Sequence, residues 1–300
     1  MIPLINCTPA NLCATFYILI MVKKALLIGI NYYNTQNELQ GCIDDIVNMR
    51  NALIDAYSYS ASNIVMLRDD NQSGLPTRAN ILAQLSALIQ QSGSLEEIWI
   101  HYSGHGSYVA DKNGDEIASG RDSTIVPCDF LTNGFIIDDE IVALLKQVKS
   151  TCRAILLFDS CFSGSVCDLP WSFEYLYGNM FSRNLVDRVT LSHPSIYMMS
   201  GCKDSQTSAD VYVASKKQYA GAFTNAFLEC LRASGHDTNI LALYRAICVY
   251  LQQVGQSQKP LLSSSNMMPT AVLTKNTAAK ALATAAAPTT TPAKKMLMQY

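Results

Sequence analysis

The chain has 300 residues, of which 49% are hydrophobic and 15% charged, and its formal net charge is −2. This composition can bury a large core, so we expect one globular domain with short extensions and exclude a chain that is disordered throughout. The small net charge and the lack of long Lys or Arg runs offer no attractive field for nucleic acid, and nucleic-acid binding is not expected.

Ten cysteines are scattered along the chain, many of them inside apolar runs. A reduced thiol in such a run behaves as a small hydrophobic side chain, and no secretory signal is recognisable. No Cys-x-x-Cys pair occurs, and the four histidines do not cluster with cysteines at zinc spacing. We therefore expect a reducing, cytoplasmic location and no structural zinc.

Residues 1–22 form a short N-terminal segment whose second half, residues 12–22, is apolar. Eleven residues are too few to span a bilayer, and the nearest basic residues, Lys23 and Lys24, follow the segment instead of preceding it. We expect the segment to pack on the domain as a strand or helix, without a membrane role.

From residue 25 onward, apolar runs alternate with segments of helical period. The predicted strands are 25–30, 63–67, 97–102, 154–158, 196–200 and a short run near 260–263, and the predicted helices are 44–57, 77–91, 139–148, 221–233 and 239–254. This alternation predicts parallel βαβ units with right-handed crossovers, and hence an α/β fold. Residues 165–194 show no clean period, and the end of the chain turns to Ala, Thr, Pro and Lys, which cannot build a core.

Two of the predicted strands run directly into reactive side chains. Residues 97–102 lead into Ser103-Gly104-His105-Gly106, and residues 154–158 lead into Asp159-Ser160-Cys161-Phe162-Ser163-Gly164. The carboxyl ends of parallel strands share one edge of a sheet, where α/β proteins collect their ligands. An imidazole and a thiol at that edge make a nucleophile and its proton acceptor.

Either motif alone is weak. A strand that ends in glycines often only turns, and a cysteine after a buried strand is more often inert packing. Together they indicate a Cys-His dyad, because His105 precedes Cys161 by 56 residues, close to the separation of about 50 in caspases.

The two motifs resemble the catalytic segments of metacaspases, which belong to the caspase-like clan of cysteine peptidases. Further matching segments follow in family order between about residues 24 and 265: Lys24–Tyr33, Leu39–Cys42, Ile137–Asp139 and Ser200–Cys202. Phe162 is a departure, because the family usually has a second His there. The resemblance implies a three-layer α/β/α sandwich around a mostly parallel sheet of six to eight strands.

The same resemblance implies the division of the chain. The catalytic domain would cover residues 23–268, with a large-subunit-like part to about 165, a linker at 165–194 and a small-subunit-like part at 195–268. Residues 269–300 would be a low-complexity flexible tail. The short linker is similar to that of type I metacaspases, although their usual prodomain, rich in Pro and Gln, is missing.

By this resemblance, Cys161 attacks as a thiolate, and His105 accepts its proton and later protonates the leaving amine. Backbone N–H groups of Gly106 and Cys161 would form the oxyanion hole. The pocket for the residue before the cleaved bond maps onto Cys42, Asp45, Ser103 and Asp159. Two carboxylates facing a slot would bind a guanidinium or ammonium group and repel an acidic one, so cleavage after Arg or Lys is expected. The open alternative is that Asp45 caps or decorates its helix and Asp159 orders the turn before Cys161.

Four further carboxylates, those of Asp122, Asp138, Asp139 and Asp168, fall where metacaspases place their calcium ligands. Ca²⁺ takes six to eight oxygens, which four Asp side chains can supply together with carbonyls and water. Each residue alone is equally consistent with a helix cap or a solvated acid, and Asp138 in particular opens a predicted helix.

The resulting hypothesis is a calcium-dependent cysteine endopeptidase that cleaves protein or peptide substrates after exposed Arg or Lys and, by resemblance, acts as a monomer. Self-cleavage is expected near Arg183, Arg188, Lys216 or Lys217, because exposed loops are where nicking concentrates. Two alternatives stay open: a catalytically silent regulatory or scaffolding relative, and a plain calcium-binding switch that has no need of the dyad.

Overall fold

A computed structural model describes residues 22–70, 73–110, 121–160, 166–186, 191–201, 210–213 and 218–275. Nearly all of the N-terminal segment and most of the expected tail lie outside these ranges. So do Cys161 and Phe162, whereas His105 and the proposed pocket and calcium residues lie within them.

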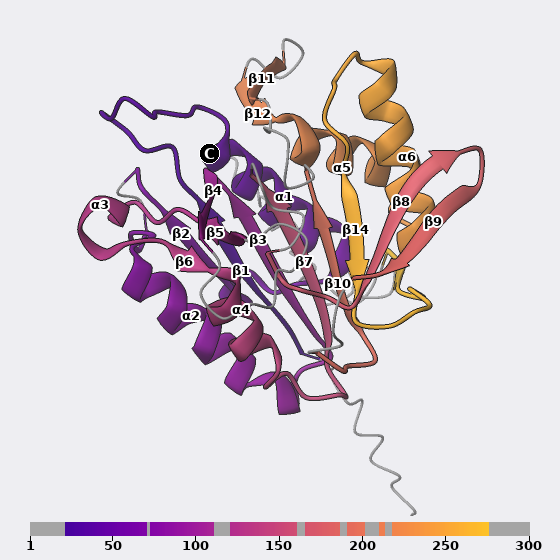
Figure 1. Ribbon diagram of the computed structural model, residues 1–300, viewed down its shortest axis with the longest axis horizontal. Coiled ribbons are helices and arrows are strands. Elements are labelled where there is room, and N and C mark those ends of the chain that lie inside the picture. Colours follow the sequence, from indigo (N-terminus) through magenta and orange to yellow (C-terminus); the bar gives the residue numbers. More distant parts are fainter. Residues whose placement is uncertain are drawn as a thin grey trace, which may run out of the picture.

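An eight-stranded sheet forms the centre of the molecule (Figure 1). In spatial order its strands are β2 (Ile64–Arg68), β1 (Lys23–Gly29), β3 (Glu97–Ser103), β7 (Arg153–Asp159), β10 (Ile196–Ser200), β14 (Leu261–Ser264), β8 (Trp171–Tyr177) and β9 (Met180–Leu185). The first five strands are parallel, and the last three each run antiparallel to the strand before them. The predicted α/β class and strand number are confirmed.

Helices cover both faces of this sheet (Figure 1). One face carries α1 (Cys42–Tyr57), α5 (Ala222–Ala233) and α6 (Ile240–Gln253), and the other carries α2 (Arg78–Gln90) and α4 (Asp138–Leu145). Along β1, Ala25 and Leu27 pack into the first layer, whereas Leu26 and Ile28 pack into the second. Such a strand is apolar on both faces, which is why it reads as an unbroken hydrophobic run. None of the helices in the described ranges is long and apolar enough to cross a membrane.

Shorter elements flank the main sheet. They are η1 (Ala61–Asn63), η2 (Ser92–Ser94), α3 (Phe130–Asn133), a three-stranded sheet of β4 (Gly106–Ala110), β5 (Arg121–Ile125) and β6 (Ile136–Ile137), and the pairs β11 (Asp210–Val213) with β12 (Gln218–Gly221) and β13 (Thr238–Asn239) with β15 (Val272–Leu273).

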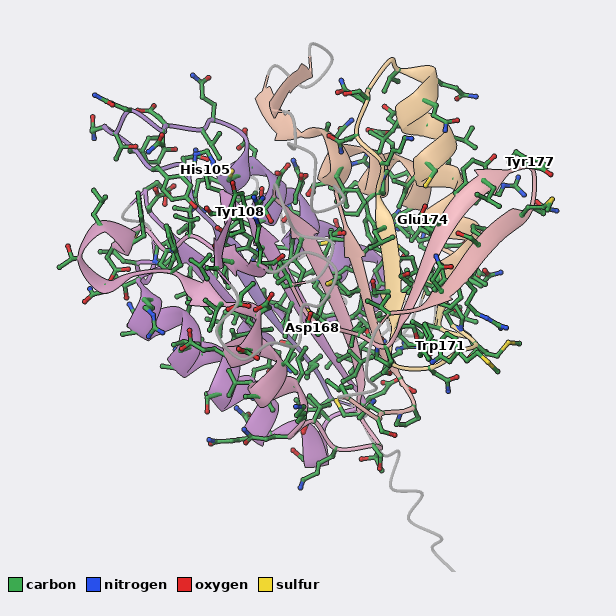
Figure 2. The ribbon with its side chains drawn as sticks, viewed as in Figure 1. His105, Tyr108, Asp168, Trp171, Glu174 and Tyr177 are labelled. Carbon is green, nitrogen blue, oxygen red and sulfur yellow. The ribbon has the colours of Figure 1, made fainter. Side chains whose placement is uncertain are left out.

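The segment expected as a linker, 165–194, instead contributes β8 and β9 to one end of the main sheet. Two features explain why the sequence of this segment shows no strand pattern. A register shift between Tyr175 and Tyr177 interrupts the alternation of side chains, and burial fades along β8 from Phe173 to the exposed Tyr177. In Figure 2, Trp171 lies at the base of this hairpin and Tyr177 near its tip.

The expected tail also begins later than residue 269. Ala271 and Leu273 are buried, and β15 pairs with β13. The Ala271 carbonyl accepts a hydrogen bond from the N–H of Ile240, at the start of α6 (2.9 Å). These few apolar residues therefore belong to the core of the domain, although the polar and Ala-rich composition around them predicts none.

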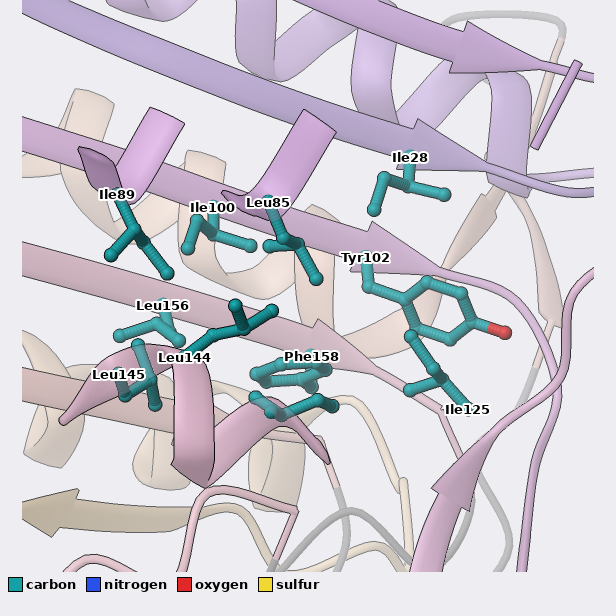
Figure 3. A pocket seen from close by; sticks show the side chains of 11 residues that line it. Ile28, Leu85, Ile89, Ile100, Tyr102, Ile125, Leu144, Leu145, Leu156 and Phe158 are labelled. Carbon is teal, nitrogen blue, oxygen red and sulfur yellow. The ribbon is translucent and has the colours of Figure 1, made fainter. Parts of the chain in front are cut away.

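The layer between the sheet and α2 and α4 contains a small cavity of about 10 Å³ (Figure 3). Its lining is almost entirely aliphatic and aromatic, with Leu85, Ile100 and Phe158 among the contributing residues. A space of this size is close to the minimum for one water molecule, and an apolar lining gives water no partners. The cavity is therefore a packing gap and not a ligand site.

Candidate active site

β3 and β7 lie side by side and end level with each other. Their register pairs Ser103 with Asp159, and the N–H of Gly104 donates to the Asp159 carbonyl (3.3 Å). His105 follows Ser103 by two residues, and Cys161, outside the described residues, follows Asp159 by two. Parallel pairing thus carries both predicted catalytic segments to the same edge of the sheet.

Two buried tyrosines fix the backbone of His105. Its N–H donates to Tyr32 Oη (3.0 Å), and its carbonyl accepts from Tyr102 Oη (2.6 Å). Tyr32 Oη itself donates to the Val126 carbonyl (2.6 Å), and the Tyr32 ring lies 4.6 Å from the imidazole between centroids. Gly104 is needed in this turn, because a Cβ there would lie 2.7 Å from Tyr102 Oη.

The half-buried imidazole of His105 is oriented by the main chain. Its Nε2 lies 2.7 Å from the carbonyl oxygen of Asn37. A carbonyl oxygen only accepts, so Nε2 carries a proton, and in the neutral ring the lone pair then lies on Nδ1. The main chain therefore selects the tautomer in which Nδ1 can accept a proton.

The four predicted pocket residues are all buried, and three of them, Asp45, Ser103 and Asp159, come together beside this edge; the fourth is Cys42. Ser103 Oγ donates to Asp45 Oδ2 (2.7 Å), and the N–H of Gly221 lies 3.1 Å from both oxygens of that carboxylate. Asp159 Oδ2 accepts from the N–H of Thr224 (2.7 Å).

Asp45 lies one turn inside its helix, and its carboxylate reaches other elements of the fold. α1 begins at Cys42, and its N-cap residue, Gly41, has no side chain that could accept a hydrogen bond. Cys42 contributes its N–H, which donates to Asn31 Oδ1 (3.0 Å). The Asp45 carboxylate bonds to β3 and to the residue that precedes α5, and so it faces the site.

Three of the four predicted calcium residues influence one another. Asp138 is buried, and burial raises the pKa of its carboxyl group to about 8, a shift to which the carboxylates of Asp168 and Asp122 add. Its oxygens accept from the N–H groups of Ser123 (2.6 Å) and Asp139 (3.0 Å), which lower that pKa. The Asp138 carboxylate therefore accepts a hydrogen bond in the first turn of α4 and also interacts with two other carboxylates.

The carboxylates of Asp122, Asp138 and Asp168 are not arranged as a complete coordination shell. Across the described ranges, no three His, Cys, Asp or Glu side chains are arranged as a metal site. The fourth predicted ligand, Asp139, is linked to this group through its backbone N–H. Figure 2 shows Asp168 well separated from His105 in that view.

Comparison with known proteins identifies the family. Residues 23–170 match the metacaspase, peptidase C14 domain. Metacaspase-1 of Schizosaccharomyces pombe is 36% identical over 291 residues, which cover 81% of this chain and 67% of that protein. The chain belongs to the metacaspase family of cysteine peptidases. Metacaspase-1 of Saccharomyces cerevisiae is 33% identical, and the match covers 66% of its length, so the chain spans about two thirds of these relatives.

Solved structures agree on the fold of this metacaspase. The protein GSU0716 from Geobacter sulfurreducens superposes with a TM-score of 0.55 at 24% identity, covering 80% of this chain and 91% of its own. Caspase-1 from Spodoptera frugiperda superposes with a TM-score of 0.54 at 10% identity, covering 82% and 87%. The caspase-like sandwich expected from the sequence is confirmed.

Sequence reasoning missed the residues that hold this site in place, namely Tyr32, Tyr102, Gly221 and Thr224. A local signal existed for Tyr32, which follows β1 at the same edge of the sheet as His105. Gly221 was the first residue of the predicted helix 221–233, but nothing local shows that it meets residues 45 and 159.

Proposed function

We propose that this metacaspase is a calcium-dependent cysteine endopeptidase that cleaves protein or peptide chains after Arg or Lys through His105 and Cys161. The observation that carries the proposal is the placement of two buried carboxylates, Asp45 and Asp159, beside the edge where β3 delivers His105 and β7 leads to Cys161. A substrate guanidinium or ammonium group would be a suitable positive partner for these two carboxylates.

The proposed reaction begins with proton transfer from the Cys161 thiol to Nδ1 of His105. The Cys161 sulfur then attacks the carbonyl carbon of the peptide bond, and the carbonyl π electrons move onto oxygen. As the tetrahedral intermediate collapses, the C–N bond breaks and the imidazolium returns its proton to the leaving amine. Water, deprotonated by His105, hydrolyses the thioester and restores the thiol.

The orientation of the Gly106 amide supports a role in stabilising the oxyanion. The N–H of Val126 donates to the His105 carbonyl, which makes Gly106 and Ile125 a pair without mutual hydrogen bonds in the β4–β5 ladder. The Gly106 N–H therefore points away from β5. We propose that it binds the oxyanion together with the Cys161 N–H.

Specificity for Arg or Lys follows from charge. Backbone N–H groups hold both carboxylates in place, that of Gly221 at Asp45 and that of Thr224 at Asp159. Two carboxylates in this slot would repel an acidic side chain and attract a cationic one. Substrates with Arg or Lys before the cleaved bond are therefore favoured.

Calcium fits the chemistry of the second carboxylate group. Asp122, Asp138 and Asp168 come from β5, α4 and the segment that follows β7, and they raise the electrostatic energy of one another. A hard divalent cation with oxygen ligands would relieve this repulsion, with Asp139 as the fourth ligand. Asp168 lies seven residues after Cys161, so binding would restrict the chain that carries the nucleophile.

Hydrolysis of short fluorogenic peptides that end in Arg, Lys, Gln or Asp, measured with Ca²⁺ and with a chelator, tests the proposal. We expect Arg and Lys turnover that needs Ca²⁺ and is abolished in Cys161→Ala and in His105→Ala, because nucleophile and base act as a unit. Ca²⁺ binding without turnover of any peptide would support the calcium-switch alternative. Full turnover in the chelator would refute the calcium dependence alone.

We also propose that the protein cleaves itself. The fold argues against one of the four expected cleavage sites. Arg183 lies within β9 opposite Phe173, and its guanidinium packs over the Trp171 ring (5.6 Å). A peptide bond held in a strand ladder cannot enter a protease site without unfolding the hairpin. The candidates that remain are Arg188, Lys216 and Lys217, outside the described residues, and mass spectrometry of fragments from the Ca²⁺-treated protein, with Cys161→Ala as control, would identify them.

A further inference from the structure

We propose that Gly221 determines the specificity of this protease, because only a residue without a side chain lets the Asp45 and Asp159 carboxylates meet at the base of the pocket. This inference rests on the proposed function and deepens it. It assigns part of the Arg or Lys pocket to the start of α5, a part of the chain that belongs to the small-subunit-like half.

The geometry at Gly221 is unusually tight. A Cβ at this position would lie 2.2 Å from Asp159 Oδ2 and 2.7 Å from Asp45 Oδ2, distances at which atoms must move. The two carboxylates therefore occupy the space on the side of residue 221 where any other amino acid would place its side chain. Gly201 is also near Asp159, but a Cβ there would lie 3.0 Å from the Phe223 Cβ and 3.2 Å from Asp159 Oδ1, contacts that require neighbours to move by only a few tenths of an ångström.

Backbone conformation is not the reason for glycine here. Gly221 has φ −60° and ψ 132°, an extended conformation that any L-residue adopts. The three atoms nearest to an Ala Cβ at this position would all belong to the two carboxylates. Both are short side chains held by hydrogen bonds, Asp45 to Ser103 and Asp159 to Thr224, so displacing them breaks these bonds.

The first residues of α5 also orient the same carboxylates. The Gly221 N–H bonds to Asp45, and the Thr224 N–H bonds to Asp159. Residues 45 and 221 are 176 positions apart in the chain, so the pocket forms only when the two halves of the domain pack together. A methyl group at residue 221 should push the negative charges away from the place where a substrate cation binds.

A double-mutant cycle tests this inference, with Gly221→Ala and Asp159→Ala singly and together, assayed in Ca²⁺ on Arg and Gln peptides. We expect Gly221→Ala to lower the Arg-to-Gln ratio of kcat/KM by about 10-fold or more, mainly through the KM for Arg. In the Asp159→Ala background, where the shorter contact is gone and only the 2.7 Å contact with Asp45 remains, the same substitution should lower the ratio by a smaller factor. Gly93→Ala is the matched control, since a Cβ there meets only a Lys149 side-chain carbon at an ordinary 3.6 Å.

The rate at which iodoacetamide alkylates Cys161 reports separately on the dyad and should stay near the wild-type rate in Gly221→Ala. An unchanged Arg-to-Gln ratio in this variant, or a full further loss in the double variant, would overturn the inference. If Gly221→Ala fails to fold, rescue of folding by Asp159→Ala supports the contact, and failure of both variants overturns it. A wild-type enzyme without Arg or Lys preference would instead refute the proposed function, before any variant is made.

Discussion

At the scale of single residues, His101 shows how strongly this sheet controls a titratable side chain. It is fully buried in β3, with Nε2 3.2 Å from Thr224 Oγ1, while its Nδ1 has no hydrogen-bond partner in the described part of the chain. Burial lowers the pKa of this imidazole to about 3. Because the Thr224 N–H holds Asp159, a neutral His101 packs against the same residue that orients the pocket.

We predict that His101 makes the fold sensitive to acid. The unfolded chain binds a proton at this imidazole below about pH 6.5 and the folded chain only below about pH 3, so its contribution to stability is complete above pH 6.5 and is lost as the pH falls toward 3. His101→Gln should reduce the slope of unfolding free energy against pH in this window by up to about 1 kcal/mol per pH unit. Urea unfolding of both proteins between pH 7 and pH 4 gives these slopes, and parallel curves would contradict the prediction.

A second prediction concerns Tyr32. Tyr32→Phe removes the hydroxyl that accepts the His105 N–H and donates to the Val126 carbonyl. Loss of one hydrogen-bond partner at a part-buried group costs on the order of 1 to 3 kcal/mol, so kcat should fall about 10-fold while KM changes little. Tyr177→Phe, on an exposed side chain at the hairpin tip, is the control. Equal kcat values in the two variants would show that Tyr32 does not position the base.

At the scale of elements, side-chain caps fix where two of the helices begin. Thr77 accepts from the N–H of Asn80 at the start of α2 (3.2 Å), and Asn239 accepts from the N–H of Ala242 at the start of α6 (2.8 Å). β13 ends at Asn239 and pairs there with β15. The position of α6 therefore depends on one polar side chain and on a short apolar pair far along the chain.

We predict that Asn239→Ala lowers the unfolding free energy by about 1 kcal/mol without altering KM, because it removes a helix cap that is remote from the pocket. Asn239→Asp keeps an oxygen acceptor and should retain most of the stability. Thermal unfolding and peptide kinetics on the same preparations separate the two effects. A raised KM in Asn239→Ala would mean that the start of α6 is coupled to the site.

At the scale of the whole molecule, the proposed calcium ligands come from three elements that are separate in sequence. Asp122 lies in β5, Asp138 begins α4, and Asp168 follows β7 and precedes β8. An ion shared by them would join the small three-stranded sheet, one helix layer and the chain after the nucleophile. Binding to the folded state alone would then raise the stability of the domain.

Ca²⁺ at 100 times its dissociation constant should therefore stabilise the protein by about 2.7 kcal/mol in thermal unfolding. Asp168→Ala should largely remove this effect, whereas Asp55→Ala, an exposed acid on α1, should keep it. The Asp168→Ala protein should still fold without Ca²⁺, since the hydrophobic layers do not involve the ion. A Ca²⁺ effect of equal size in both variants would rule out Asp168 as a ligand.

Much of this fold could be predicted from sequence because its central strands are buried on both faces. β1, β3 and β7 read as continuous apolar runs, and the glycines and reactive side chains that follow β3 and β7 mark the edge where they end. β8 and β9 were not predicted, because a register shift interrupts the alternation of their side chains and because the residues of β8 become more exposed along the strand.

The sequence by itself determined the family, the α/β class and the residue types at the catalytic edge, since these depend on local patterns and ordered motifs. Only the tertiary structure decided that Asp45 bonds to β3 and to the residue before α5, that the Asn37 carbonyl selects the His105 tautomer, and that Gly221 leaves room for two carboxylates. These contacts join residues between 58 and 176 positions apart. Local propensity carries no information about them, because they arise from strand register and from the packing of α5 against the sheet.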